Sequence, residues 1–211
     1  MAILLLADTH FGLSRGPGFD WAMQALHVGK TTGCSGFIFA GDAVDRRFIN
    51  ERTHHEFTQF FTTAANFFET SLFIAGNHDV HHDFELPAGV LRAATAPESY
   101  AFPDNTIVHT AATLSDPDPR RLVPTFPKKS TKARANIGVL HTSLVGEHSK
   151  SECLPTTPFE LDAHGYDAWL LAHVHQPLTV NCATPSRWIG MGTGLIFDPQ
   201  DRSVHDLADV F

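Results

Sequence analysis

The sequence has few cysteines, no long hydrophobic run and no excess of basic charge, and each absence excludes a class of protein. The three cysteines (Cys34, Cys153 and Cys182) are widely spaced and odd in number, so we expect a reducing cytoplasm and no disulfide framework. No apolar run approaches the ~18 residues that a membrane span needs. The net charge of −8 argues against a protein that coats nucleic acid or an anionic membrane surface.

The remaining composition is that of a globular domain with a sizeable core. Hydrophobic residues make up 43% of the 211 residues, and charged residues make up 18%. Short apolar runs alternate with helical patterns, which predicts an α/β domain. We predict strands over residues 3–7, 36–40, 72–75, 106–110, 137–141, 168–172 and 188–191, and helices over residues 20–31 and 51–69. In the longer helix, core packing is predicted for the residues that recur at helical spacing, which are Phe57, Phe60, Phe61, Ala64 and Phe68.

Positive charge is concentrated in one segment, residues 120–134. This segment has six basic residues, no acidic residue and two prolines, so it is predicted to be an exposed loop. The rest of the chain then carries 9 basic against 23 acidic residues. Such a loop is either a solvated connection or a surface that binds a polyanion through its lysines and arginines. The basic residues are Arg120, Arg121, Lys128, Lys129, Lys132 and Arg134.

Polar residues gather wherever a predicted strand ends. Carboxylate, amide and imidazole side chains at the carboxyl edge of an α/β sheet are typical of a ligand site, because open α/β sheets bind their ligands there. Gly41 and Gly76 precede two of these groups, where a sharp turn must clear the site. The residues are Asp8, His10, Asp42, Asp45, Arg46, Asn77, His78, Asp79, His141, His173 and His175.

The donor set has no thiolate, which suits Mn²⁺, Fe²⁺ or Zn²⁺ better than a soft-metal or cluster site. His78 follows Asn77 directly and is not needed for coordination, so it is a candidate general acid. Arg46 is a candidate phosphate ligand or a structural ion-pair partner.

These motifs, in the order D-x-H, GD-x-x-D, GNHD, H and H-x-H, resemble the calcineurin-like metallophosphoesterases from Asp8 to His175. Within that family, the phrases LLLADTHFG, FAGDAVDR, IAGNHD, VLHTSL and GYDAWLLAHVHQP are most similar to the SbcD-type DNA exonucleases. The resemblance implies a four-layer αββα sandwich. It also implies a centre of two divalent ions, with Mn²⁺ expected from the nuclease subgroup.

The resemblance assigns a role to each residue of the site. It implies that Asp42 bridges the two ions and that Asp45 orients His78, although the sequence leaves Asp79 as an alternative for the orienting role. The expected ligands of one ion are Asp8, His10 and His175. The expected ligands of the other ion are Asn77, His141 and His173.

The sequence departs from the family pattern in two respects. Ala172 replaces the glycine that usually precedes the last histidine pair, and we expect its methyl group to lie close to the metal pocket. The SbcD-type enzymes usually continue into a capping domain and an ATPase-binding region, whereas a single metallophosphoesterase domain over residues 1–211 is expected here. The resemblance implies an SbcC-type ATPase partner, and the missing regions argue against one.

Three hypotheses on function follow. The first is a Mn²⁺-dependent DNA nuclease, an exonuclease of the SbcD type, with Arg46, Lys128, Lys129 and Lys132 as candidate substrate contacts. The second is a phosphodiesterase or phosphatase that acts on a small nucleotide or a phosphoprotein, which the net charge and the missing cap favour. The third, a catalytically inactive scaffold, conflicts with the complete set of ligands. A membrane partner is not expected.

The other histidines lie outside the motifs, and we expect surface or structural roles for them. They are His27, His54, His55, His81, His82, His109, His148, His164 and His205.

Overall fold

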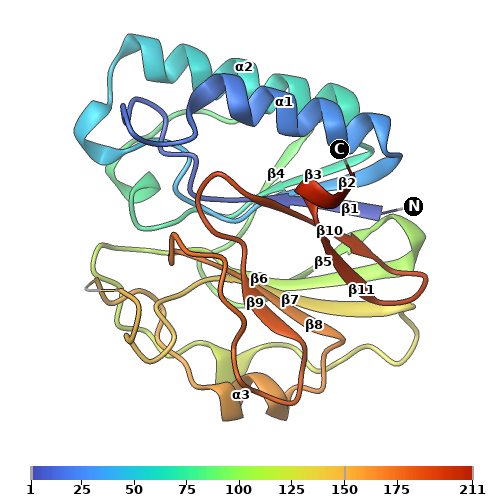
Figure 1. Cartoon of the computed structure of the whole chain (residues 1–211). Coiled ribbons are helices and arrows are strands. Elements are labelled where there is room, and N and C mark those ends of the chain that lie inside the picture. The colour runs from blue at the N-terminus through green and yellow to red at the C-terminus, as the bar shows by residue number, and fades with distance from the viewer. Residues whose placement is uncertain (1, 150, 211) are drawn as a thin grey trace.

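The computed structural model describes residues 2–149 and 151–210. Two β-sheets face each other at its centre, and helices lie on the outer faces (Figure 1). The architecture confirms the predicted α/β class and the four-layer sandwich. The outermost layer on one side consists of two long helices. On the other side it consists of one short helix and its neighbouring loops.

The first sheet has the strand order β11-β10-β1-β2-β3-β4. The strands β1 to β4 are parallel, and β10 and β11 extend the sheet in antiparallel fashion beyond β1. Every residue of β2 is buried, as expected for a central parallel strand with both faces covered. The strands are β1 (Ala2–Leu6), β2 (Cys34–Phe39), β3 (Thr70–Phe73), β4 (Val90–Arg92), β10 (Gly194–Asp198) and β11 (Ser203–Asp206).

The second sheet has the order β5-β6-β7-β8-β9 and is parallel except for β5 at its edge. Its central strands are apolar runs that are buried on both faces. The strands are β5 (Glu98–Phe102), β6 (Thr106–Ala111), β7 (Ala135–His141), β8 (Ala168–Ala172) and β9 (Ser186–Trp188).

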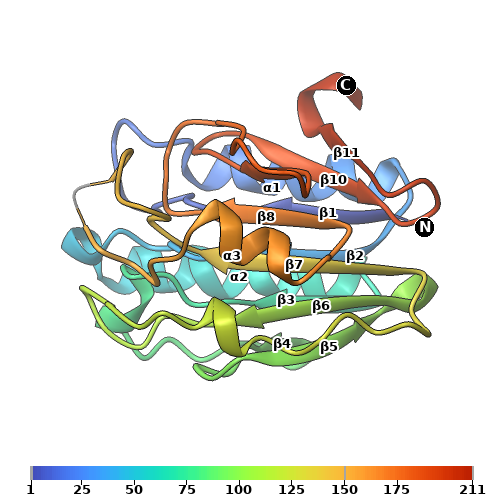
Figure 2. The same cartoon turned by 90° about the horizontal axis from the view of Figure 1, so that it is seen from below.

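The helices cover the outer faces. Helices α1 (Gly18–Thr31) and α2 (Glu51–Phe67) lie on the first sheet, and α3 (Pro158–Ala163) lies across β7 and β8 of the second (Figures 1 and 2). Asn50 caps α2 in a reciprocal capping box with Thr53. The short 3₁₀ turns are Arg46–Phe48, Asp79–His81, Pro103–Asn105, Val123–Thr125 and Leu207–Val210.

Alternating side chains divide the core into layers. In β1, Ile3 and Leu5 face the second sheet, whereas Leu4 and Leu6 face the helices. The predicted phenylalanine stripe of α2 is buried against that helical face of the sheet, which confirms its core role. The two sheets are therefore held together by a continuous apolar layer, which fixes the distance between their edges.

The structure differs from the predicted elements mainly outside the motif-bearing strands. The strand predicted over residues 188–191 is wrong in position, since β9 ends at Trp188. The edge strands β4, β5 and β11, the internal strand β10 and the six-residue helix α3 were not predicted. The three edge strands are short or exposed, so they carry little hydrophobic periodicity. The basic segment 120–134 is a loop with a single 3₁₀ turn, as predicted.

Among the described residues, no helix is long and apolar enough to cross a membrane.

Candidate metal centre

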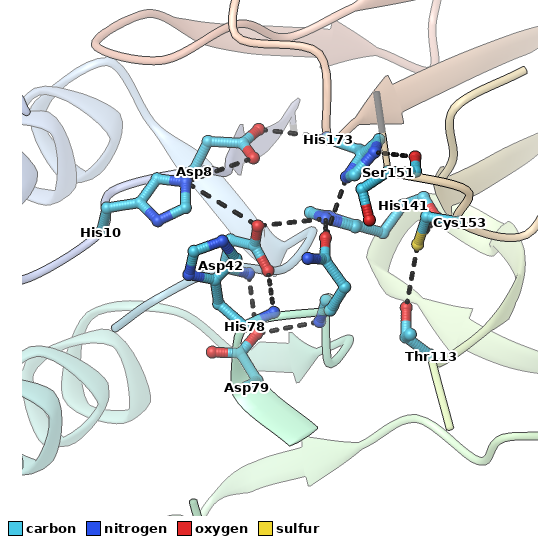
Figure 3. Close-up of polar contacts among 12 residues, drawn as sticks. Asp8, His10, Asp42, His78, Asp79, Thr113, His141, Ser151, Cys153 and His173 are labelled. Carbon is cyan, nitrogen blue, oxygen red and sulfur yellow. Dashed lines mark hydrogen bonds and ion pairs between the residues drawn. The ribbon is translucent and has the colours of Figure 1, made fainter. Parts of the chain in front are cut away.

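The carboxyl ends of parallel strands from both sheets meet at one edge of the sandwich. Asp8 follows β1, Asp42 follows β2 and Asn77 follows β3. From the opposite sheet, His141 ends β7 and His173 follows β8. The side chains of Asp8, Asp42, His141 and His173 point toward one another (Figure 3). The predicted convergence at the sheet edge is therefore present, and it joins two sheets rather than one.

The backbone is strained where these side chains leave the strands. Asp8, His10, Asp42 and His173 have φ values of 52°, 44°, 59° and 87°. The left-handed region is unfavourable for residues with a side chain, and such strain persists only where the surroundings enforce it. Four strained positions gather in this one cluster, which is common at functional sites.

Two glycines permit the close approach of the strand ends. A Cβ at Gly41, where φ is 104°, would lie 2.5 Å from Nδ1 of His141. A Cβ at Gly76 would lie 2.7 Å from the backbone nitrogen of Asp42. Any side chain at either position would therefore displace a candidate ligand, which confirms the expectation that these turns must clear the site.

The first ligand group combines one carboxylate with two imidazoles. Nε2 of His10 lies 3.1 Å from Nε2 of His175 and 3.9 Å from Oδ1 of Asp8. Nε2 of His175 lies 4.0 Å from the same oxygen. Three donors at these separations are able to surround one cation.

The second ligand group lies beside the first. Oδ1 of Asn77 is 2.9 Å from Nδ1 of His173 and 3.2 Å from Nε2 of His141. Asp42 lies between the groups, because its Oδ2 is 3.3 Å from Nε2 of His141 and 3.7 Å from Nε2 of His10. The geometry brings together all seven residues predicted as metal ligands, with Asp42 at the bridging position.

An unpaired polar atom indicates that the site fits a cation. Oδ1 of Asp8 is fully buried and has no hydrogen-bond partner among the described residues. Burying such a carboxylate oxygen without a partner is costly, and a divalent ion would remove that cost. The oxygen and imidazole donors match the preferences of Mn²⁺, Fe²⁺ and Zn²⁺.

The pKa values reflect the crowding of charge in this buried space. Burial raises the pKa of Asp8 to about 7 and lowers the pKa values of His10 and His173 to about 4. Burial alone would also lower the pKa of His141, but the Asp42 carboxylate outweighs it and raises this pKa to about 9. In return His141 overcomes the effect of burial on Asp42 and holds the pKa of that carboxyl far below its ordinary value.

Hydrogen bonds behind the cluster orient two of the imidazoles. Nδ1 of His141 donates to the carbonyl oxygen of Ala40 at 2.8 Å, which directs Nε2 into the cluster. Nε2 of His173 lies 3.1 Å from the carbonyl oxygen of Ser151 and 2.8 Å from Oγ of Ser149, which leaves Nδ1 for the cluster. Such partners fix the tautomer and the orientation of a metal-ligating histidine.

The two carboxylates near His78 have different roles. Asp79 accepts the backbone N–H groups of Asp42, Ala43 and Gly76 at 2.7, 3.0 and 2.9 Å, so it holds the two turns of the site in place. Asp45 instead lies near the imidazole, with its Oδ2 at 3.9 Å from Nδ1 of His78. Of the two alternatives left open by the sequence, the geometry favours Asp45 as the partner of His78.

Arg47 holds Asp45 in that position. Its Nε and Nη2 donate to the two oxygens of the Asp45 carboxylate, each at 2.9 Å. Burial would raise the pKa of Asp45, but these bonds from Arg47 lower it to about 2. Asp45 is therefore a fixed negative charge beside His78.

A cavity of about 660 Å³ opens onto the cluster. Arg46 lines it, as the sequence analysis proposed for a substrate contact, and also forms an ion pair with Asp116. Residues of the β7–β8 connection that the sequence analysis did not select complete the wall; they include His148, for which a surface or structural role was expected. No motif marks this connection, because its position depends on how the second sheet packs.

The structure places the lysines of the basic loop away from the cluster. Lys129 forms an ion pair with Asp167, which precedes β8, whereas His173 follows β8. A five-residue strand spans roughly 16 Å at ~3.3 Å per residue, so the two positions are at opposite ends of the sheet. Lys132 lies at that distant end too, since its carbonyl oxygen accepts a bond from Asn105, just before β6.

Ala172 packs in the core beside His141, its cross-strand partner on β7. It ends β8, is fully buried and belongs to the apolar layer between the two sheets. The alternation along β8 places it on the same face as Ala168 and Leu170. The extra methyl is therefore part of the core packing.

Metal binding should release protons, because two of the ligands carry them in the metal-free protein. Near pH 6 both Asp8 (pKa about 7) and His141 (pKa about 9) are protonated, whereas His10 and His173 (pKa about 4) are neutral. We expect the Mn²⁺ affinity to rise steeply with pH below 7 and more gently between 7 and 9. Calorimetry in buffers of different ionisation enthalpy measures the proton release. An affinity that is constant from pH 5.5 to 8.5 would contradict the assignment.

Comparisons with known structures agree with this fold. The structure is similar to the protein TT1561 of Thermus thermophilus (TM-score 0.62, 10% identity, 97% of each chain) and to a dimetal phosphatase of Danio rerio (TM-score 0.56, 7% identity, 92% of each chain). It is also similar to a protein assigned as a 5′-nucleotidase from Staphylococcus aureus (TM-score 0.56, 12% identity), with 97% of this chain covering 52% of that one.

These likenesses show the fold alone. Comparison with curated protein sequences finds no significant match. The family model described as calcineurin-like phosphoesterase matches residues 1–177, which include every residue of the predicted metal centre. The chain therefore belongs to the calcineurin-like phosphoesterase family.

Proposed function

We propose that the chain hydrolyses a small, nucleotide-sized phosphoester at a dinuclear metal centre. Membership of the family indicates metal-dependent hydrolysis of phosphoesters in general. The observation that supports a small substrate is the cavity of about 660 Å³ over the cluster, which has the size of a site for a small molecule. The similarity in fold to a phosphatase and to a protein assigned as a nucleotidase is consistent with this substrate class.

The proposed ligands are the two groups described above, with Asp42 shared between them. Two divalent ions held there would polarise the phosphoryl oxygens and promote the ionisation of a water molecule at neutral pH. The neutral imidazoles of His10 and His173 offer lone pairs without first losing a proton. The protein thus provides a preorganised site whose negative charge is concentrated at Asp8 and Asp42.

His78 is proposed to donate a proton to the leaving oxygen. Its Nδ1 accepts the backbone N–H of Arg46 at 3.2 Å, so the proton of the neutral ring lies on Nε2. The ring lines the cavity, where a leaving group would be within reach. The carboxylate of Asp45 lies beside this ring, with its Oδ2 at 3.9 Å from Nδ1 of His78.

A DNA nuclease of the SbcD type is the second candidate. Lys128 and Lys129 line a surface cavity of about 630 Å³ together with Phe126 and Phe159, and lysines beside aromatic rings are typical of surfaces that bind single strands. Against this candidate, the cavity is distant from the metal cluster, and Lys129 is already paired with Asp167. The SbcD-like motifs favour it, and Mn²⁺ remains the proposed metal for either candidate.

A substrate panel with Mn²⁺ separates the two candidates. We expect turnover of nucleoside phosphates or of a bis-aryl phosphodiester, and at least tenfold slower cleavage of linear single- and double-stranded DNA per phosphodiester bond. Release of phosphate, of aryl alcohol and of DNA fragments is measured under identical conditions. Rapid digestion of DNA with no turnover of small esters would overturn the proposed substrate class, and turnover of no substrate would favour the scaffold hypothesis.

Removal of the His78 imidazole should slow turnover strongly without removing the ions. General acid catalysis contributes ~10²–10⁴-fold, so we expect His78→Ala to lower kcat by about that factor. The loss should be smallest for substrates with good leaving groups, which need no proton. Elemental analysis should still find two equivalents of Mn²⁺ per chain. Loss of an ion in this variant would instead make His78 a ligand.

Charge reversal in the basic loop tests the nuclease candidate separately. Because these lysines lie at the far end of the sheet, the triple variant Lys128→Glu, Lys129→Glu and Lys132→Glu should leave the turnover of small phosphoesters within twofold of the unmodified protein. Lys30→Glu on α1 is the control for a change of surface charge. A weaker affinity for DNA with a flatter salt dependence in the triple variant would show that the loop binds nucleic acid.

A further inference from the structure

Asp116 is a buried carboxylate that connects three segments at the rim of the cavity. It lies in the connection between β6 and β7, and its side chain is 5% exposed. It forms an ion pair with Nη1 of Arg46, which follows β2. Its Oδ2 lies 3.3 Å from Nε2 of His81, and its Oδ1 accepts the hydroxyl of Ser151 at 3.2 Å. No sequence motif contains this residue.

Two of these partners line the cavity from different sides. Arg46 belongs to the half of the site that the first sheet provides, and Ser151 belongs to the β7–β8 connection of the second. A charge this deeply buried is costly unless it is fully paired, so the position of Asp116 constrains both walls at once. The carboxylate is thus a link across the mouth of the site.

The link extends to the metal cluster. The carbonyl oxygen of Ser151 lies 3.1 Å from Nε2 of His173 (Figure 3). Nδ1 of His173 lies 2.9 Å from Oδ1 of Asn77. The contact between Asp116 and Ser151 therefore helps to hold the β7–β8 connection, which orients the candidate ligand His173. On the other side, the backbone N–H of Arg46 contacts His78.

We propose that Asp116 is a positioning residue that holds the Arg46 guanidinium over the candidate metal centre, where it binds the non-reacting oxygens of the phosphoryl group. This inference rests on the proposed function. The Arg46 side chain is 47% exposed, so without a partner it would sample many rotamers. Asp116 contacts Nη1, and a guanidinium has five N–H donors in a planar fork, so the remaining donors can bind a phosphate.

The test is Asp116→Asn, which keeps the size of the side chain and removes its charge. Asp118→Asn is the matched control, because Asp118 lies two residues further in the same connection and pairs with Arg120 at 2.6 Å outside the cavity. We expect Asp116→Asn to lower kcat/KM about tenfold, mainly through KM, with two Mn²⁺ equivalents retained. Asp118→Asn should keep kcat/KM within twofold. Equal losses of activity in the two variants, or unfolding of Asp116→Asn alone, would overturn the proposal.

A double-mutant cycle identifies the route through Arg46. If Asp116 acts by positioning the guanidinium, Arg46→Ala should lower kcat/KM to a similar extent, and the double variant should lose no more than Arg46→Ala alone. Asp116→Glu, which keeps the charge, should recover part of the loss. Losses that multiply in the double variant would show that Asp116 and Arg46 act independently and would overturn the proposal.

Inorganic phosphate provides a readout that does not depend on turnover. Calorimetry on the Mn²⁺-loaded protein should show phosphate binding that weakens about tenfold in both Asp116→Asn and Arg46→Ala. That result, combined with no turnover of any phosphoester, would refute the proposed function and leave the positioning role intact. Turnover by the unmodified protein with the same phosphate affinity in Asp116→Asn would refute the positioning role alone.

Discussion

The buried carboxylate of Asp42, which lies between two groups of imidazoles, is the interaction on which the rest of the site depends. One of its oxygens is 3.3 Å from His141 and 3.7 Å from His10, and the other accepts the backbone N–H of His78 at 2.8 Å. A carboxylate in this position lowers the repulsion between two cations roughly 4 Å apart. The strained turn at Asp42 presents this carboxylate. Asp79 accepts two backbone N–H groups from that turn and one from Gly76 in the neighbouring turn.

The packing of the two sheets fixes the relative position of the two halves of the site. Candidate ligands after β1, β2 and β3 meet candidate ligands from β7 and β8. The apolar layer between the sheets holds their separation, together with hydrogen bonds such as that of His141 to Ala40. Close packing of that layer makes the separation rigid, which a dinuclear centre requires because small displacements change the coordination. Leu5 from the first sheet and Leu170 from the second both belong to this layer.

The distribution of charge bears on the substrate. Arginine and lysine side chains of the basic loop are paired with acids of the same chain, as in Arg120 with Asp118, Arg121 with Glu160 and Lys129 with Asp167. Positive charge that is compensated in this way attracts a polyanion less strongly than the number of basic residues in the segment suggests. Arg46 is also paired with an acid, Asp116, but it lines the cavity over the metal cluster. The positive charge that a bound phosphoester could contact is therefore located at the candidate metal centre.

The sequence by itself determined the α/β class, the strands that carry the motifs and the candidate ligands, because each ligand directly follows an apolar run. The sequence also indicated that Gly41 and Gly76 form turns that clear the site, because that role depends on local backbone conformation. Only the tertiary structure decided that Asp45 rather than Asp79 lies beside His78, that Ala172 packs in the core, and that Lys129 is distant from the cluster. It also decided the place of Asp116, whose partners are 70 and 35 residues away along the chain. Such contacts arise from the packing of two sheets, and no local pattern records which loop ends meet.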